Sequence, residues 1–442
     1  MTDNKNNVSL NAAFDRQLIW QRGGSVRYLV VDVTTSEVIN PVRQQQLPLN
    51  LALVIDASGS MAGPPLTAAC EAACRVVEGL SEIDRLSVVS FADDVQQHAA
   101  SVAMKPDRKA VVQQNLRQLA TRGCTDLAGG WLAGAECVAR DMEERSNCRN
   151  RVVLLSDGHA NRGIQDPHEL ARIATDLRTR GVYSSTVGIG DNYSSDQILA
   201  IAEAGGGRMH DAARPEEIAE VVLAEIRDLT QTMADNVLIQ IELPSGVEID
   251  VLGTYPFEVG SGRATCAVGS LGSAATRRVA FKLQLPAGTV SQKLLFNTRA
   301  TFRPQGATVD VAIGGPTVEL EFVEGHRNST QPRDIERSIA IAKLWQAHVV
   351  RTTVQLNRAG DYQAAEAYLS QELGFFTRYC EGLPDTAVLI AQLEHTRRTA
   401  GQAWNERARK NMTVALYKSA RCEVDDRVAE QAAWFENLPT ED

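Results

Sequence analysis

The sequence predicts a multidomain protein in which an α/β domain is combined with an antiparallel β-sandwich and a C-terminal helical region. Between residues 48 and 230, short apolar runs alternate with longer amphipathic stretches, a pattern typical of a mostly parallel sheet with helices on both faces. From 235 to 325, apolar and polar residues alternate in short segments separated by Gly, Pro and Ser, which indicates antiparallel strands. After about residue 332, an apolar repeat of three and four residues predicts helices.

The apolar runs of the α/β region are its predicted strands. They cover residues 51–55, 86–91, 152–155 and 182–189. Gly63-Pro64-Pro65 marks the start of the first helix, which ends near Gly79, because proline suits the first turn of a helix. Further helices are expected at 106–119, 127–143, 166–179, 194–203 and 215–230.

A second group of predicted strands lies before the α/β region. Leu18–Trp20 and Val26–Val33 flank Gly23-Gly24, which is a hairpin-turn signal. We expect these strands to join the later β segments in one sandwich, with the α/β domain inserted between them. Those later segments are Val237–Leu243, Arg278–Leu285 and Thr317–Val323. The predicted divisions are therefore 1–47 for the N-terminal strands, 48–232 for the α/β domain, 233–328 for the sandwich and 329–442 for the helices.

The C-terminal region is predicted to be a helical bundle. One helical face is formed by Ile335, Ile339, Ala342, Trp345 and Val349. Gly360-Asp361 ends that helix, and an Ala-rich stretch then begins another, as in a helical hairpin.

Composition excludes several classes of protein. With 44% hydrophobic and 23% charged residues the chain is globular, and 55 acidic against 45 basic side chains disfavour nucleic acid as a partner. The first residues lack a secretory leader, and no apolar run approaches a membrane span, so we expect a cytoplasmic protein that does not enter a membrane. The eight cysteines form no C-x-x-C pair, and Cys70 and Cys74 lack the Cys/His partners of a zinc site.

Oxygen-bearing side chains follow the predicted strands. In LALVIDASGSMAG an apolar strand leads into Asp56, Ser58 and Ser60, whose side chains point the same way if the loop is extended. Thr125 lies in a Gly-containing loop before a helix, and Asp157 directly follows a buried strand. Ligands of open α/β sheets bind at the carboxyl ends of the strands, and hard oxygen donors suit Mg²⁺. The sequence therefore predicts a cation site at this edge.

This set resembles the metal-ion-dependent adhesion site of von Willebrand factor A (vWA) domains, whose pattern is D-x-S-x-S, then Thr, then Asp. All of its positions are matched here, by Asp56, Ser58, Ser60, Thr125 and Asp157. The resemblance covers residues 48 to 230, including GIGDNYSSDQILAIAEAGGGRMHDA, and is closest in character to intracellular bacterial vWA proteins. It implies a Rossmann-like domain that binds Mg²⁺, or alternatively Mn²⁺ or Ca²⁺, through three hydroxyls and through two carboxylates that contact the ion directly or by way of water. A Glu or Asp of a partner protein would complete the coordination.

Simpler roles for the same residues are also open. Asp56 or Ser58 could cap a helix, and Thr125 and Asp157 could be turn residues. Asp126 could cap the helix that begins near Leu127, and His159 is not expected to be a ligand.

The leading functional hypothesis is a non-catalytic, metal-dependent protein-binding module that serves as an adaptor or scaffold in an intracellular multiprotein system. Its variants are an adaptor for an AAA+ ATPase and a scaffold of a kinase or phosphatase stress-response system. A surface adhesin is disfavoured by the lack of an export signal. An Mg²⁺-dependent phosphoryl-transfer enzyme is disfavoured because residue 58 is Ser where such enzymes commonly have a second acid, and because the usual phosphate-loop and hydrolase motifs are missing.

Overall fold

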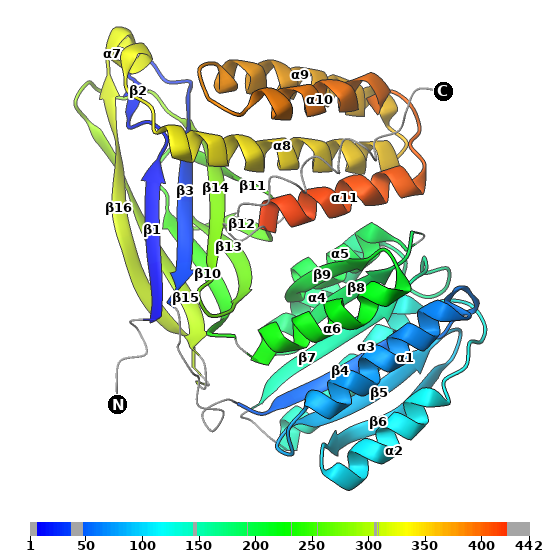
Figure 1. Ribbon diagram of the computed structural model, residues 1–442. Helices are drawn as coiled ribbons and strands as arrows, with labels where there is room; N and C mark the ends of the chain where they lie inside the picture. Colours follow the sequence, from blue (N-terminus) through cyan, green and yellow to red (C-terminus); the bar gives the residue numbers. More distant parts are fainter. Residues whose placement is uncertain are drawn as a thin grey trace. The chain divides into compact units, whose positions relative to one another are not determined.

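The computed structural model describes residues 7–36, 47–144, 148–191, 193–230, 232–253, 255–304, 307 and 309–421. The chain divides into two compact units (Figure 1). The α/β segment up to Met233 forms one unit. The N-terminal strands, the segment from Ala234 onward and the C-terminal helices form the other.

The α/β unit contains a six-stranded sheet with the order β6-β5-β4-β7-β8-β9. Its strands are β4 (Leu49–Asp56), β5 (Arg85–Phe91), β6 (Val95–Ala103), β7 (Arg149–Ser156), β8 (Tyr183–Ile189) and β9 (Gly206–Ala212). All neighbours are parallel except β5 and β6. The apolar runs correctly predict β4, β5, β7 and β8. Edge strand β6 has no such run, because polar residues at 96, 97, 98 and 101 interrupt its apolar residues.

Helices cover both faces of this sheet. They are α1 (Pro64–Gly79), α2 (Pro106–Arg117), α3 (Leu127–Glu144), α4 (Pro167–Thr179), α5 (Ser195–Ala204) and α6 (Pro215–Thr230), close to the predicted ranges. Leu51, Leu53 and Ile55 of β4 share a core with α1 and α6. Val54 points to the opposite face, where α3 lies so close that a Cβ on Gly134 would be 2.3 Å from Val54 Cγ2.

Arg149, a buried residue, joins the two ends of the α/β unit. Arg149 donates its backbone N–H to Pro48 O at 2.8 Å, and its guanidinium donates to Leu229 O at 2.7 Å and Thr232 O at 2.8 Å. The first and last segments of the unit therefore lie side by side.

On α6, the buried Glu225 accepts hydrogen bonds from Ser185 and His210. Burial opposes the charge of Glu225, but His210, Arg208 and Ser185 outweigh it and lower the pKa of this carboxyl to about 2.

The second unit contains a β-sandwich. One sheet has the order β1-β3-β14-β11 and the other β12-β13-β10-β15-β16-β2. The strands are β1 (Val8–Phe14), β2 (Leu18–Trp20), β3 (Ser25–Thr35), β10 (Ala234–Glu242), β11 (Glu248–Leu252), β12 (Phe257–Gly260), β13 (Arg263–Leu271), β14 (Thr276–Leu285), β15 (Lys293–Pro304) and β16 (Val311–Val323). β3 pairs antiparallel with β14, from Ser25 opposite Leu285 to Thr34 opposite Thr276. The predicted pairing of the N-terminal strands with the later β segment is thus present.

The predicted hairpin at Gly23-Gly24 is wrong. β2 pairs in parallel with β16 in the six-stranded sheet, whereas β3 belongs to the other sheet. Gly23 donates its N–H to Trp20 O, and Gly24 donates to Leu285 O, with φ of +82° and +74°. These glycines make a tight turn, as expected, but the turn carries the chain from one sheet to the other.

The C-terminal region is helical, as predicted. Its helices are α7 (Gly325–Thr330), α8 (Ile335–Arg358), α9 (Tyr362–Cys380), α10 (Ala387–Ala400) and α11 (Glu406–Arg421). Asp361 caps α9 by accepting the Ala364 N–H, so the helix stop lies where the sequence indicates. Ala342, Trp345 and Val349 are buried, but Ile335 at the start of α8 is 44% exposed. Among the described residues, no helix combines the length and the apolar character needed to cross a bilayer.

These helices form one compact unit with the sandwich. Tyr28, Val30 and Ala280 of the four-stranded sheet share a core with Trp345 and other residues of α8–α11. The predicted division between residues 328 and 329 falls within α7 and does not separate compact units.

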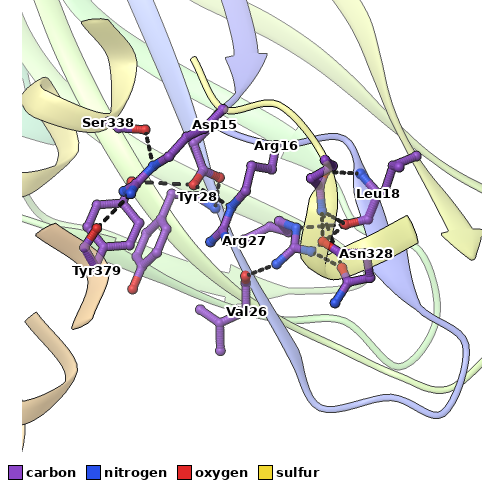
Figure 2. Close-up of polar contacts among 11 residues, drawn as sticks. Asp15, Arg16, Leu18, Val26, Arg27, Tyr28, Asn328, Ser338 and Tyr379 are labelled. Carbon is purple, nitrogen blue, oxygen red and sulfur yellow. Dashed lines mark hydrogen bonds and ion pairs between the residues drawn. The ribbon is translucent and has the colours of Figure 1, made fainter. Parts of the chain in front are cut away.

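A buried polar cluster lies where the N-terminal strands meet these helices (Figure 2). The Asp15 carboxylate accepts hydrogen bonds from the Tyr28 N–H at 3.1 Å, the Tyr379 hydroxyl at 3.3 Å and Arg16 Nε at 3.3 Å. Arg27 donates to backbone carbonyls at Leu18 and Val26 and to the Asn328 side chain. Burial, together with Arg16, lowers the pKa of Arg27 to about 10. The cluster links β1 and β3 to α7 and α9.

Candidate metal centre

The predicted ligands come from three loops at the carboxyl edge of the α/β sheet. Asp56 is the last residue of β4, and Asp157 directly follows β7, the parallel neighbour of β4. Ser58 precedes a short 3₁₀ turn, Gly59–Met61, that contains Ser60. Thr125 lies two residues before α3. Because β4 and β7 run in parallel side by side, their carboxyl ends bring two of the loops together.

The side chains of the first and third loops are in direct contact. The Ser58 and Ser60 hydroxyl oxygens are 3.0 Å apart, and Ser60 Oγ donates to Asp157 Oδ1 at 2.7 Å. Asp56 Oδ1 accepts the Ser58 N–H at 2.8 Å. Residues 97 positions apart in the chain therefore place hydroxyl and carboxylate oxygens at one point.

The second loop lies against the third through Gly158. A Cβ on Gly158 would be 3.3 Å from Thr125 Oγ1 and 3.5 Å from Ser60 Oγ. The missing side chain lets the Thr125 and Ser60 hydroxyls approach the same backbone position.

The two carboxylates are costly to keep charged in the metal-free protein. Asp56 is fully buried, and burial raises its pKa, although hydrogen bonds from Ser156 and Ser58 act in the opposite direction. Burial also raises the pKa of Asp157 to about 6, with the nearby Asp56 charge adding to the rise and the Ser60 hydrogen bond opposing it. A cation bound among these oxygens would offset both the burial and the mutual repulsion.

The donor chemistry fits a hard divalent cation. In the described part of the chain, no group of three or more His, Cys, Asp or Glu side chains is placed to hold a metal. A site here would depend on serine and threonine hydroxyls together with two carboxylates, a set that suits Mg²⁺, Mn²⁺ or Ca²⁺ better than zinc. Cys70 and Cys74 are buried thiols on α1.

Sequence reasoning missed two residues that support the ligands. Ser156 Oγ donates to Asp56 Oδ2 at 2.6 Å and accepts the Gly158 N–H at 3.3 Å, so it links the first and third loops. Asn161 Oδ1 accepts the Thr125 N–H at 3.0 Å. The only sequence signal for Ser156 is its position beside Asp157 at a strand end. Asn161 has none, because its role depends on how two distant loops fold.

Asp126 and His159 adjoin the predicted ligands but are not expected to bind the metal. Asp126 Oδ1 accepts the Gly129 N–H at 2.9 Å in the first turn of α3, as expected for a helix cap. His159 is exposed on the third loop.

Comparison with known proteins identifies the family of the α/β region. The family described as von Willebrand factor type A domain matches residues 50–223. This chain carries a vWA domain. Such domains are typically protein-interaction modules and often bind a metal ion.

Two of the relatives are bacterial proteins that match less than half of this chain. The protein sll0103 of Synechocystis sp. is 31% identical over 195 residues, which is 43% of this chain and 43% of that protein. YfbK of Escherichia coli is 30% identical over 205 residues, which is 45% of this chain and 35% of that protein. The matched region thus spans less than half of either relative.

A solved structure shares the whole architecture. A von Willebrand factor type A protein from Catenulispora acidiphila superposes with a TM-score of 0.69 and 16% identity, over 95% of this chain and 98% of that one. At this identity the likeness concerns the fold alone. It extends beyond the vWA domain to the sandwich and the helices.

Proposed function

We propose that this protein is a non-catalytic binding module whose vWA domain holds Mg²⁺ and uses it to bind an acidic residue of a partner protein. The observation that carries the proposal is the meeting of Ser58, Ser60 and Asp157 oxygens within hydrogen-bond distance beside the buried Asp56 carboxylate. Mn²⁺ or Ca²⁺ could replace Mg²⁺ in the same oxygen set.

The charge of this donor set favours an acidic partner. The five side chains supply at most two negative charges, so a bound divalent cation would not be over-neutralised. Mg²⁺ prefers six oxygen ligands and keeps some of them as water. A carboxylate of another protein can replace one such water, and it is a stronger ligand than a neutral group because it adds charge attraction.

The support for a binding role, as opposed to catalysis, lies in the same residues. Hydroxyls and buried carboxylates bind a cation well, whereas phosphoryl-transfer enzymes that use an aspartate at a strand end commonly carry a second acid where Ser58 stands. We further propose that the protein acts inside the cell as an adaptor or scaffold, with the sandwich and the helices offering additional binding surface.

Calorimetric titration of the full chain with Mg²⁺ and Mn²⁺ tests the metal site. We expect saturable binding by the wild type and a large loss of affinity in Thr125→Ala. Thr179→Ala removes the same hydroxyl from the exposed end of α4 and should bind as the wild type does. Equal binding by all three proteins, or no binding by any, would contradict the proposal.

Affinity capture from a cell lysate tests the partner. We expect a set of proteins that is retained in Mg²⁺ and released by EDTA, and that Thr125→Ala does not retain. A captured set that is the same with and without chelator would show that binding does not depend on the metal. Replacing the captured partner's acidic residues by amides would then identify the ligand carboxylate.

A further inference from the structure

Asn161 holds both backbone groups of Thr125. Its side-chain Oδ1 accepts the Thr125 N–H at 3.0 Å, and its own N–H donates to Thr125 O at 3.1 Å. A second backbone bond, from the Arg162 N–H to the same carbonyl at 3.3 Å, supports the pair. Thr125 is 4% exposed, whereas Asn161 lies on an exposed part of its loop.

This pairing requires the asparagine side chain. In a loop, a backbone N–H is normally satisfied by secondary structure, by water or by a side-chain cap. The Asn161 amide takes this role for Thr125 across 36 residues of sequence. An alanine would keep the two backbone bonds to the Thr125 carbonyl but would leave the Thr125 N–H without its acceptor.

The contact also links two of the ligand loops. Asn161 lies four residues after Asp157, and Gly158 between them lies against the Thr125 hydroxyl. The loop that carries Asp157 therefore contacts Thr125 at its backbone and at its side chain.

We infer that Asn161 is a positioning residue of the metal site, which fixes the Thr125 hydroxyl relative to Asp157. The inference rests on the proposed metal-binding function. It assigns to Asn161 no contact with the cation itself: the residue acts through Thr125. Groups that orient metal ligands commonly influence metal affinity in this way.

Metal affinity in a double-mutant cycle tests the inference, with Mn²⁺ as the titrated ion. We expect Asn161→Ala to weaken binding about threefold to tenfold, the range for loss of one hydrogen bond that supports a ligand. In the Thr125→Ala background the same substitution should change metal affinity by less than about 1.5-fold, because the hydroxyl that Asn161 is inferred to position is no longer present. Gln165→Ala removes an exposed amide from the same loop and is the matched control.

Hydrogen exchange of the Thr125 amide in EDTA gives a readout that does not involve metal. We expect exchange about tenfold faster in Asn161→Ala than in the wild type, because the acceptor of that N–H is lost. Asn161→Asp keeps an acceptor oxygen and should restore the slow exchange. Thermal unfolding of each variant in EDTA verifies that it is folded.

Each outcome separates the two claims. If the wild type binds no Mn²⁺ or Mg²⁺, the proposed function fails. If the wild type binds metal but Asn161→Ala binds equally well, the positioning role is overturned. A loss of affinity that persists in full in the Thr125→Ala background also overturns it, because the effect would then not pass through Thr125.

Discussion

Substitution of Gly134 by alanine tests how closely α3 packs on the sheet. A Cβ at this position would lie 2.3 Å from Val54 Cγ2, whereas carbon atoms in contact are normally about 3.5–4.0 Å apart. Val54 is fully buried on a central strand, so the shortfall of about 1.2–1.7 Å has to be met by moving the helix or the strand. Gly130, one turn earlier, is in a similar position against Phe91, so α3 cannot simply tilt about this point.

The expected effect is a net loss of stability. Overpacking of a core costs about 1–3 kcal/mol, and this overlap belongs at the upper end. Alanine gains about 1 kcal/mol over glycine from helix propensity. The free energy of unfolding of Gly134→Ala should therefore fall by about 2 kcal/mol, which corresponds to about 1 M in the urea midpoint. Because α3 begins two residues after Thr125, metal affinity should fall as well.

Urea unfolding of the metal-free protein, followed by circular dichroism, measures the effect. Val54→Ala removes the atom that clashes, so the double variant should be more stable than the sum of the single effects by over about 1 kcal/mol. Gly79→Ala, at the end of α1, is the control, because a Cβ there meets nothing within 4 Å among the described residues. If Gly134→Ala instead raises stability, as alanine does at an open helical site, the reasoning about close packing is refuted.

Four further substitutions have distinct expected results. Because the pKa of Glu225 lies below its ordinary 4.5, the stability from its charge is present above about pH 4.5 and is lost as the pH falls toward 2. Glu225→Gln should thus be less stable than the wild type by about 3 kcal/mol at pH 6, and the difference in urea unfolding should vanish near pH 2; a difference independent of pH would contradict this. Gly374 lies at an exposed position within α9, where an added Cβ would meet no described atom within 4 Å. Gly374→Ala should therefore raise the free energy of unfolding by about 0.5–1 kcal/mol. If the melting temperature does not rise, this glycine has another role. Asp15→Ala leaves the buried Tyr28 N–H and the Tyr379 hydroxyl without their acceptor, so it should lower the free energy of unfolding by about 2–3 kcal/mol. Tyr379→Phe should lower it by about 1 kcal/mol. Chemical denaturation measures both values, and equal effects would argue against Asp15 as the centre of the cluster.

Most of the α/β unit could be predicted because its signals are local. Buried parallel strands contain a continuous apolar run, such as residues 51–55 of β4, and helix starts are marked by residues such as Pro64. The same rule explains the failure at β6, an antiparallel edge strand in which polar and apolar residues are mixed. The Gly23-Gly24 turn was identified, but which sheets it connects depends on residues near 285 and 323 and cannot be deduced from the turn itself.

One feature of the β3 sequence is consistent with the helices that cover the sandwich. Tyr28 to Val31 form a continuous apolar run, and a strand that is apolar on both faces is buried on both faces. Val31 faces the sandwich core and Val30 faces α8 and its neighbours. The run could therefore have indicated that a layer lies outside this sheet.

The candidate site was predictable to the extent that its residues follow strands. Asp56 and Asp157 meet because β4 and β7 are parallel neighbours, a general property of such sheets. The supporting contacts of Ser156 and Asn161 depend on loop conformation and on single hydrogen bonds. Such contacts carry no periodicity or spacing that a sequence reveals.

The Arg149 contacts at the ends of the α/β unit bear on how the chain folds during synthesis. Val31 of β3 cannot pair with Val279 of β14 until Val279 has been synthesised. At a rate of synthesis of about 5–20 residues per second, the chain between them takes tens of seconds to emerge. Once the inserted unit has closed, Arg149 holds Pro48 through its backbone N–H and Thr232 through its guanidinium, so the chain segment that separates the flanking strands becomes effectively short. Each halving of that effective loop lowers the entropic cost of closure by about 0.6 kcal/mol. We expect the α/β unit to fold first on the ribosome. It would then hold the N-terminal strands near the strands from Ala234 onward, so that the two groups can assemble into the sandwich.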